Sequence, residues 1–394
     1  MDRRTLTLAS TALLAAALAG CGGSGQSASP FVAVPPPGSL AAQNTTATTA
    51  PATGTAAGAP TAQTDAAAPA AAKPSGPRPA LAPTGSGSYT DANGGFSYVY
   101  YVPSHHKRSY PVVLALHGCL ENPTNFEAGT RWFEDAEAHG YVVVMPQHLP
   151  TNVPVNPKGC WQYWSDHYRD RGEPAVLVGL LNDLGHRIPF DRNRTYVTGM
   201  SSGGAMTTAL AADYPDVFAA AAVGSGTEYQ PCATDSVGEC YVALTTQQAD
   251  QDPTASGKAA FRASAPTAAT NVVPTILFQG DADTVVAPFN LPQALTSIAV
   301  MNDGIASYGR FPGTWTANPA THDGGIVPNG GYVYDHYTAN DGRLDWTIVH
   351  GMNHAWSGGV ADPSSNASDG NNYNDPKGPN ETAVFRAFLF RHHR

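Results

Sequence analysis

The sequence predicts an α/β fold in which helices cover both faces of a mostly parallel sheet. Short, almost wholly apolar segments such as residues 111–116 and 141–145 have the composition of strands that are buried on both faces. These segments alternate along the chain with segments in which apolar residues recur at helical spacing, as in residues 173–187. Strands that alternate with helices form parallel sheets, because each connecting helix packs back onto a face of the sheet.

The elements can be placed in order from residue 96 onward. Residues 96–102 alternate aromatic and small side chains, which indicates an early strand. Further strands are expected at residues 111–116, 141–145 (closed by Pro146), 195–197, 219–223 and 275–278, with a hairpin at 332–338 and 344–349 around the turn Asn340-Asp341-Gly342. Helices are expected at residues 125–139, 173–187, 205–214, 291–300 and 381–391.

The start of the chain predicts export. Residues 1–20 contain a basic start and a short apolar stretch and precede Cys21, as in a bacterial lipoprotein signal peptide, after which lipid is attached to the cysteine. An ordinary secretory signal is the alternative reading. The apolar stretch is too short to span a bilayer. We therefore expect a protein anchored by lipid to the bacterial cell envelope, at the outer membrane or the cell surface, or released outside the cell.

Composition divides the rest of the chain into two parts. Residues 21–87 consist mainly of Ala, Thr, Pro, Ser and Gly, with almost no large apolar side chains. Such a segment buries too little surface to offset the entropy of ordering, so we expect a disordered tether that starts at the lipidated Cys21. Residues 88–394 are of a size that one α/β domain with a full core can occupy.

The charge balance excludes one class of partner. The chain has 21 Lys and Arg against 31 Asp and Glu, a formal net charge of −10, and contains no long basic run. Nucleic-acid binding needs a concentrated basic face. We therefore expect no nucleic-acid partner, and we attribute the acidic balance to solubility.

The cysteines agree with an oxidising compartment. Apart from Cys21 there are four, Cys119, Cys160, Cys232 and Cys240, which allow three sets of pairings. We favour Cys119 with Cys160 and Cys232 with Cys240, because the second pair closes a short polar loop. A metal site is the competing interpretation. The chain has no Cys-x-x-Cys, and His350 and His354 are separated by a loop that contains glycine, so we expect no metal.

A candidate nucleophile lies in Gly199-Met200-Ser201-Ser202-Gly203. This segment follows the β-branched run at residues 195–197 and precedes the helix expected from Ala205. Glycines on both sides let a strand turn abruptly into a helix and hold the serine in a strained, exposed position. A glycine-rich turn whose serine only caps the helix is the alternative. The strand before the motif and the helix after it favour Ser201 as a nucleophile.

A serine nucleophile needs a base that a carboxylate holds in one tautomer. In α/β-hydrolases the acid and then the histidine follow the serine along the chain, each on a loop after a later strand. Asp281 and Asp283 follow the strand at 275–278, and His350 and His354 follow the strand at 344–349. We favour Asp283, because Asp281 stands beside a turn glycine and can bond its own backbone. We favour His354, because a histidine that closes a strand is usually structural.

Two backbone N–H groups are expected to stabilise the oxyanion. In the α/β-hydrolase fold one comes from the residue after the nucleophile, here Ser202, and one from the loop after an early buried strand, here Cys119. His117 is an alternative base. It precedes the serine, however, and the base of this fold follows the serine, so we expect His117 to shape its turn.

Several motifs in one order carry a family resemblance. They are Leu116-His117-Gly118-Cys119, Cys160-Trp161, residues 191–206, residues 280–286, residues 354–359 and Gly378-Pro379-Asn380. Together they resemble the extracellular polyhydroxybutyrate depolymerase and esterase family, which also contains feruloyl and acetylxylan esterases. The likeness covers nearly all of residues 88–394, which would then be the catalytic domain of an α/β-hydrolase.

The resemblance implies an activity and a site. It implies a serine esterase that needs no cofactor, with Ser201, Asp283 and His354 as the catalytic triad, and it supports the Cys119–Cys160 disulfide. The expected substrates are short 3-hydroxybutyrate esters or oligomers, with feruloyl or acetyl esters of plant walls as the alternative. Secreted depolymerases of solid polymer usually carry a binding domain after the catalytic one, whereas this chain ends with the last expected helix. Soluble oligomers or small esters are therefore favoured over granules.

A rival from another class is a binding lipoprotein that keeps the hydrolase fold without turnover. Such a protein would have no reason to retain Ser201, Asp283 and His354 in the order of a triad. The sequence does not indicate an oligomeric state.

Overall fold

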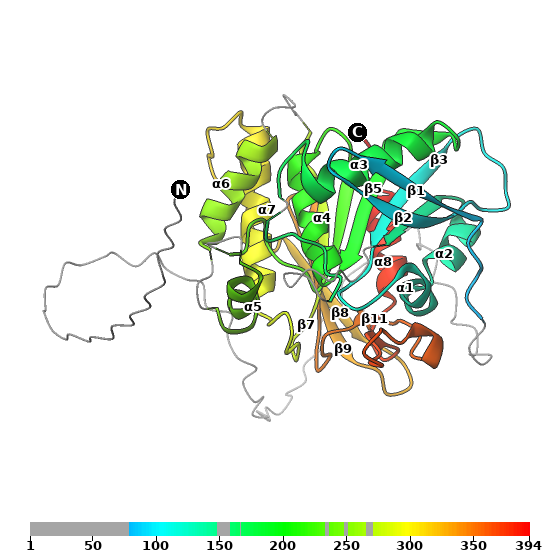
Figure 1. The fold of residues 1–394 in the computed structure, drawn as a ribbon. Coiled ribbons are helices and arrows are strands. Elements are labelled where there is room, and N and C mark those ends of the chain that lie inside the picture. Colours follow the sequence, from blue (N-terminus) through cyan, green and yellow to red (C-terminus); the bar gives the residue numbers. More distant parts are fainter. Residues whose placement is uncertain (1–78, 148–157, 166, 233–235, 248–250, 265–270) are drawn as a thin grey trace, which may run out of the picture. The chain divides into compact units, whose positions relative to one another are not determined.

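The structure is a computed structural model that describes residues 79–147, 158–165, 167–232, 236–247, 251–264 and 271–394 (Figure 1). All of these residues belong to one of the two units of the chain, residues 72–394. The predicted signal peptide, Cys21 and the tether up to residue 78 lie outside the described residues.

A ten-stranded sheet forms the centre of this unit. Its spatial order is β1 (Gly85–Asp91), β2 (Gly94–Tyr101), β4 (Val142–Gln147), β3 (Tyr110–Leu116), β5 (Phe190–Met200), β6 (Ala220–Gly224), β7 (Thr275–Gly280), β10 (Leu344–Val349), β9 (Val333–Ala339) and β8 (Thr321–Ile326). In this spatial order, the neighbouring strands from β4 through β3, β5, β6 and β7 to β10 pair in parallel. The pairs at both edges, β1 with β2, β2 with β4, β10 with β9 and β9 with β8, are antiparallel. The predicted fold class is confirmed.

Helices cover both faces of the sheet. They are α1 (Pro123–Thr130), α2 (Trp132–His139), α3 (Gly172–Gly185), α4 (Ser202–Asp213), α5 (Val237–Thr246), α6 (Pro253–Ser264), α7 (Asn290–Ala306) and α8 (Glu381–Leu389). Successive side chains of a strand point to opposite faces, and in β3 Val112 packs with side chains of α3 and α4, whereas Val113 packs with α2 and α8. Figure 1 shows α4 on the near side of the sheet and α8 on the far side.

The helix expected over residues 125–139 is in fact two helices. The chain between α1 and α2 passes through Arg131, whose φ is 60°. The side chain of Glu127 accepts the N–H of Phe133, at 3.0 Å and 3.1 Å from its two oxygens, and so caps the start of α2. The apolar spacing continues through both helices, which is why the periodicity alone predicts one.

Pro146 does not close its strand as expected. It lies within β4, opposite Tyr98 of β2. On its other side β4 pairs with β3 only as far as Val144. The N–H that proline lacks is therefore not needed for pairing with β3.

The predicted boundary at Ser88 is a few residues too late, because β1 begins at Gly85. The small residues of this strand fit against tyrosines of β2: a Cβ at Gly85 would lie 2.5 Å from the hydroxyl of Tyr100, and one at Gly87 would lie 2.6 Å from that of Tyr98. Because β1 contains glycines and serines, its composition resembles that of the linker before it, and composition alone does not mark where the strand begins. The elements α5, α6 and β8 were also not expected from the sequence.

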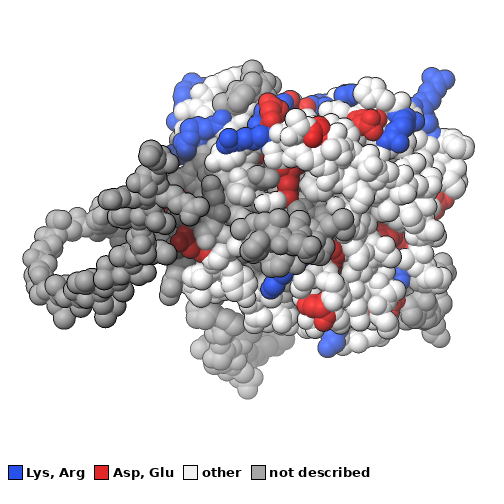
Figure 2. Space-filling view, viewed as in Figure 1, with Lys and Arg blue, Asp and Glu red and all other residues white. Residues whose placement is uncertain are grey.

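The described surface carries few charges on the face shown in Figure 2. Basic and acidic side chains stand near one another along its upper edge, and most of the remaining described surface is uncharged. Of the helices described, none has the length and apolar character that crossing a membrane requires.

Candidate active site

Ser201 stands in the tight turn between β5 and α4. Its φ of 56° and ψ of −120° form a conformation that residues with a side chain rarely adopt. Gly203 lets the turn lie this close to β3, because a Cβ there would be 2.2 Å from the carbonyl oxygen of Leu116. A strained serine between a strand and a helix, with glycines beside it, has the geometry of a nucleophile elbow.

The backbone of the elbow is hydrogen-bonded to β6, and the elbow leads directly into the N-terminus of α4. The N–H of Ser201 donates to the carbonyl oxygen of Gly224, the last residue of β6, at 2.9 Å. Ser202 is the first residue of α4. The first N–H groups of a helix have no partner within the helix and lie at its positive end. The backbone beside Ser201 can therefore stabilise negative charge.

His354 and Asp283 meet at the edge of the sheet. They lie on the loops after β10 and β7, which are parallel neighbours, so both loops leave the sheet at the same edge. Nδ1 of His354 lies 2.8 Å from Oδ2 of Asp283, and both side chains are buried. The other carboxylate oxygen accepts the N–H groups of Val285 and Val286 at 2.8 Å and 2.9 Å. An imidazole that donates from Nδ1 to a carboxylate presents Nε2 as a proton acceptor.

Asp281 and His350 form a second pair on the same two loops. Oδ2 of Asp281 lies 2.8 Å from Nδ1 of His350, and Oδ1 accepts the N–H of Gly351 at 2.6 Å. Nε2 of His350 lies 3.0 Å from Asp335 in β9. The expectation that Asp281 bonds its own loop is therefore corrected, because the carboxylate binds the loop after β10. His350 has the structural position expected of a residue that closes a strand.

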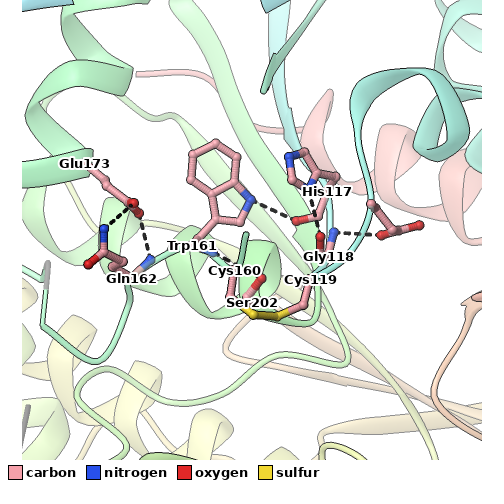
Figure 3. Close-up of a disulfide and its surroundings, with 9 residues drawn as sticks. His117, Gly118, Cys119, Cys160, Trp161, Gln162, Glu173 and Ser202 are labelled. Carbon is pink, nitrogen blue, oxygen red and sulfur yellow. Dashed lines mark hydrogen bonds between the residues drawn. A yellow bond between two sulfur atoms is a disulfide. The ribbon is translucent and has the colours of Figure 1, made fainter. Parts of the chain in front are cut away.

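The turn after β3 is fastened to the nucleophile elbow (Figure 3). The structure contains the predicted disulfide between Cys119 and Cys160. The next residue, Trp161, donates its indole N–H to the carbonyl oxygen of His117 at 2.8 Å and its backbone N–H to Oγ of Ser202 at 3.4 Å. The disulfide and these two hydrogen bonds thus connect the turn that contains Cys119 to the start of α4.

The predicted disulfide between Cys232 and Cys240 is also present. Cys240 belongs to α5, and its partner lies in the loop before that helix. Ser236 caps α5 by accepting the N–H of Glu239 at 3.5 Å. The disulfide therefore fixes the first turns of a helix that borders the cavity described next.

A cavity of about 490 Å³ lies above Ser201. Residues from well-separated parts of the sequence line it: Gly118, Cys119, Leu120, Glu121, Lys158, Cys160, Tyr163, Trp164, Met200, Ser201, Ser202, Ala205, Thr227, Val237, Gly238, Tyr241, Leu244, Val285, Val286, His354 and Tyr373. Most of these side chains are apolar. The lining includes both Ser201 and His354 and both residues predicted to supply oxyanion N–H groups, Cys119 and Ser202.

The tryptophans Trp161, Trp164 and Trp356 have different positions relative to the cavity. Trp164 lines the cavity. Trp161 is wholly buried and holds the turn after β3. Trp356 is buried against Phe126 and Phe385. Only Trp164 is thus placed to contact a substrate.

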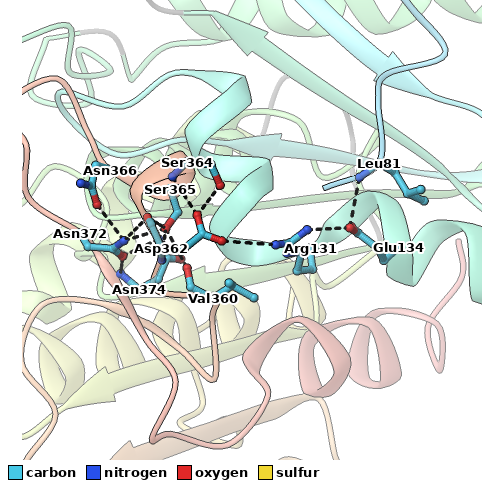
Figure 4. A network of polar contacts seen from close by, with 10 residues as sticks. All are labelled: Leu81, Arg131, Glu134, Val360, Asp362, Ser364, Ser365, Asn366, Asn372 and Asn374. Carbon is cyan, nitrogen blue, oxygen red and sulfur yellow. Dashed lines mark hydrogen bonds and ion pairs between the residues drawn. The ribbon is translucent and has the colours of Figure 1, made fainter. Parts of the chain in front are cut away.

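The polar loop at residues 361–375 reaches the cavity through Tyr373. Its side chains bond to one another and to the residue after α1: Asp362 accepts the N–H of Ser364 at 2.8 Å and lies 3.8 Å from Arg131 (Figure 4). The N–H of Ser368 donates to the carbonyl oxygen of Leu120 at 2.8 Å. The loop thus packs on the turn after β3. No group of His, Cys, Asp and Glu side chains suited to a metal ion occurs in the described part of the chain.

The comparison with protein families agrees with this geometry. Residues 96–314, more than half of the chain, match the family described as esterase PHB depolymerase. The chain belongs to this family. The matched region includes the candidate nucleophile and acid, and His354 lies beyond it.

Individual relatives extend the comparison. The chain is 38% identical to poly(3-hydroxyalkanoate) depolymerase C of Paucimonas lemoignei, over 34% of this chain and 32% of the relative. It is 31% identical to feruloyl esterase B of Thermothelomyces thermophilus, over 33% of this chain and 43% of the relative. The alignments thus span less than half the length of these curated relatives. The solved acetyl xylan esterase of Aspergillus awamori is similar in fold, with a TM-score of 0.56 and 20% identity over 68% of this chain and 94% of that chain.

Two parts of the cavity were not identified from the sequence. One is α5, which contributes Val237, Tyr241 and Leu244. The other is Glu121, a buried carboxyl three residues after Gly118. A glutamate immediately after a predicted oxyanion turn is a signal that could have been noted, because carboxyl groups in turns often bond nearby backbone.

Proposed function

We propose that this protein hydrolyses carboxylic esters through an acyl-enzyme on Ser201. The observation that carries the proposal is the 2.8 Å contact between His354 Nδ1 and Asp283, at the edge of a cavity that Ser201 also lines. Membership of the esterase PHB depolymerase family supports the reaction class. A binding lipoprotein without turnover would not need a buried pair of this kind beside a strained serine.

In the proposed first step, Oγ of Ser201 attacks the ester carbonyl carbon while its proton passes to Nε2 of His354. Asp283 holds the ring by Nδ1 and stabilises the imidazolium that forms. The tetrahedral oxyanion receives N–H groups from Cys119 and Ser202. The intermediate then collapses, the alcohol leaves with the proton from His354, and the acyl group remains on Ser201.

The second step repeats this chemistry with water. His354 removes a proton from water, the resulting hydroxide attacks the acyl carbon, and Ser201 leaves and recovers its proton. The carboxylic acid product then leaves the cavity. No cofactor takes part in either step.

The cavity wall supports substrates with an apolar part. Tyr163, Trp164 and Val286 are buried parts of the wall, whereas Tyr241 and Val285, which lie at its rim, are 56% and 37% exposed. Such a rim suits short acyl chains or oligomers with repeated methyl groups, such as 3-hydroxybutyrate oligomers. Feruloyl or acetyl esters of plant walls are the second candidate, because named relatives act on them.

The test is an assay of the purified protein on 3-hydroxybutyrate oligomers, p-nitrophenyl butyrate and methyl ferulate. We expect the highest kcat/KM on the aliphatic esters. The variant Ser201→Ala is expected to lose roughly 10⁴-fold or more in kcat while it keeps its thermal stability. Retention of a tenth of the activity by this variant would remove Ser201 from the mechanism, and a preference for methyl ferulate would favour the second candidate.

A further inference from the structure

Glu121 is a buried carboxyl group in the cavity wall to which the proposed mechanism gives no task. Its side chain is only 4% exposed. It lies on the same turn as Cys119, the proposed oxyanion donor. Burying an ionised carboxyl beside a site where negative charge develops is unfavourable unless the carboxyl is hydrogen-bonded, paired or neutralised.

The carboxyl group fixes one side of the oxyanion turn. Oε2 of Glu121 accepts the backbone N–H of Gly118 at 2.7 Å. On the other side of Cys119, the N–H of Leu120 donates to the carbonyl oxygen of Lys158 at 2.8 Å. The His117–Gly118 and Cys119–Leu120 peptide groups are thus held in place, and the peptide group that carries the N–H of Cys119 lies between them.

Gly118 is packed between Glu121 and the nucleophile. A Cβ on Gly118 would be 2.8 Å from Oε2 of Glu121 and 3.5 Å from Cβ of Ser201. Only the backbone of Gly118 therefore separates the carboxyl group of Glu121 from the side chain of Ser201. At this distance both its hydrogen bond and its charge act on the tetrahedral intermediate.

We propose that Glu121 is a positioning residue for ester hydrolysis: it holds the oxyanion turn through Gly118, and the enzyme is more active when Glu121 is neutral than when it is ionised. The proposal rests on the proposed function. A neutral carboxyl or amide oxygen can still accept the Gly118 N–H, whereas a carboxylate adds negative charge next to the developing oxyanion.

The surroundings of Glu121 bring this ionisation into the working range. Burial raises the pKa of Glu121 to about 7, although the N–H of Gly118 lowers the pKa and Asp369 adds to the increase. Among the described residues, Lys158, His354 and Tyr373 are further titratable groups of the same cavity, and Nδ1 of His117 lies 2.7 Å from the carbonyl oxygen of Gly118. The fraction of neutral Glu121 thus falls as the pH rises through about 7.

Two substitutions separate the two parts of the proposal. Glu121→Gln keeps an acceptor for Gly118 and removes the charge, whereas Glu121→Leu removes both. With ethyl butyrate in a pH-stat, Glu121→Leu is expected to lower kcat roughly tenfold to a hundredfold with little change in KM, and Glu121→Gln to restore most of it. The ratio of kcat/KM for Glu121→Gln to that of wild type is expected to rise roughly fivefold or more from pH 6 to pH 9.

The ratio isolates Glu121, because the two proteins differ only at this residue. The matched control is Glu127→Gln, since Glu127 is also buried and accepts a backbone N–H but does not line the cavity. Its ratio should not depend on pH. A ratio for Glu121→Gln that is flat with pH overturns the proposal, as does a Glu121→Leu enzyme with wild-type kcat. If Glu121→Leu does not fold, the Glu121→Gln ratio alone decides. Failure of the wild-type protein on all esters would instead count against the proposed function.

Discussion

The two aspartates of the loop after β7 are two residues apart but have different partners. Asp283 binds His354 and two backbone N–H groups inside the site, whereas Asp281 binds His350 and Gly351 outside it. We expect Asp283→Asn to lower kcat roughly 10³- to 10⁴-fold, because an amide no longer holds the required tautomer of His354. Asp281→Asn should cost less than about tenfold. Steady-state kinetics of both variants on one soluble ester tests this, and the opposite ranking would move the acid to Asp281.

The sequence predicts those residues of the candidate site that can be recognised from their order along the chain and from the elements before them. Ser201 is marked by its glycines, and Asp283 and His354 by the strands before them. The partner of Asp281 could not be predicted, because it depends on two loops from different strands meeting at one edge of the sheet. Glu121 was missed for a similar reason: its burial depends on the loop at residues 361–375 packing over the turn.

At the level of elements, the two disulfides hold different parts of the cavity. Loops of 41 and 8 residues correspond to about 4 and about 2.5 kcal/mol of stability on the loop-entropy estimate. We expect the double variant Cys119→Ser/Cys160→Ser to lower the melting temperature and kcat, because Cys119 supplies a proposed oxyanion donor. We expect Cys232→Ser/Cys240→Ser to raise KM instead, because α5 lines the cavity without touching the reacting atoms. Equal effects on kcat would contradict this division.

The cluster around His350 gives stability a pH dependence. Its hydrogen bond to Asp281, followed by that to Asp335, raises the pKa of His350 above its usual 6.5. The stabilisation is therefore complete below pH 6.5 and is lost as the pH rises through the raised value of the folded protein. His350→Asn should lower the melting temperature more at pH 6 than at pH 9, whereas His106→Asn, at an exposed site, should have no such dependence. An equal loss at both pH values for His350→Asn would show that protonation does not contribute.

Elements buried on both faces were predictable and those at the edges were not. The mostly apolar strands β3, β4, β6 and β7 stand out in composition. In contrast, β1 and β8 are largely half-buried or exposed and rich in Gly, Ser and Thr, so they have the composition of loops. Their place is set by pairing with β2 and β9, which is information that a local pattern does not contain.

At the scale of the whole molecule, the sequence predicts that the catalytic domain is tied to a membrane. If Cys21 carries lipid, about 60 residues separate it from β1, and a flexible chain of that length has an r.m.s. reach of roughly 45 Å. We propose that this reach suits diffusible esters near the cell surface. In this proposal the reach is too short for an anchored enzyme to hydrolyse substrates that lie far from the cell surface.

This proposal predicts a change of location without a change of chemistry. Cys21→Ala should move the enzyme from the membrane fraction to the soluble fraction, because the substitution removes the proposed site of lipid attachment. Its kcat/KM on a small ester should equal that of wild type, since the described residues that line the cavity all follow residue 117. Wild-type protein found only in the medium, with no acyl group at its N-terminus by mass spectrometry, would refute the anchor. Attack on distant polymer would then become the better explanation for the apolar rim of the cavity, because an enzyme free to diffuse can reach such a substrate.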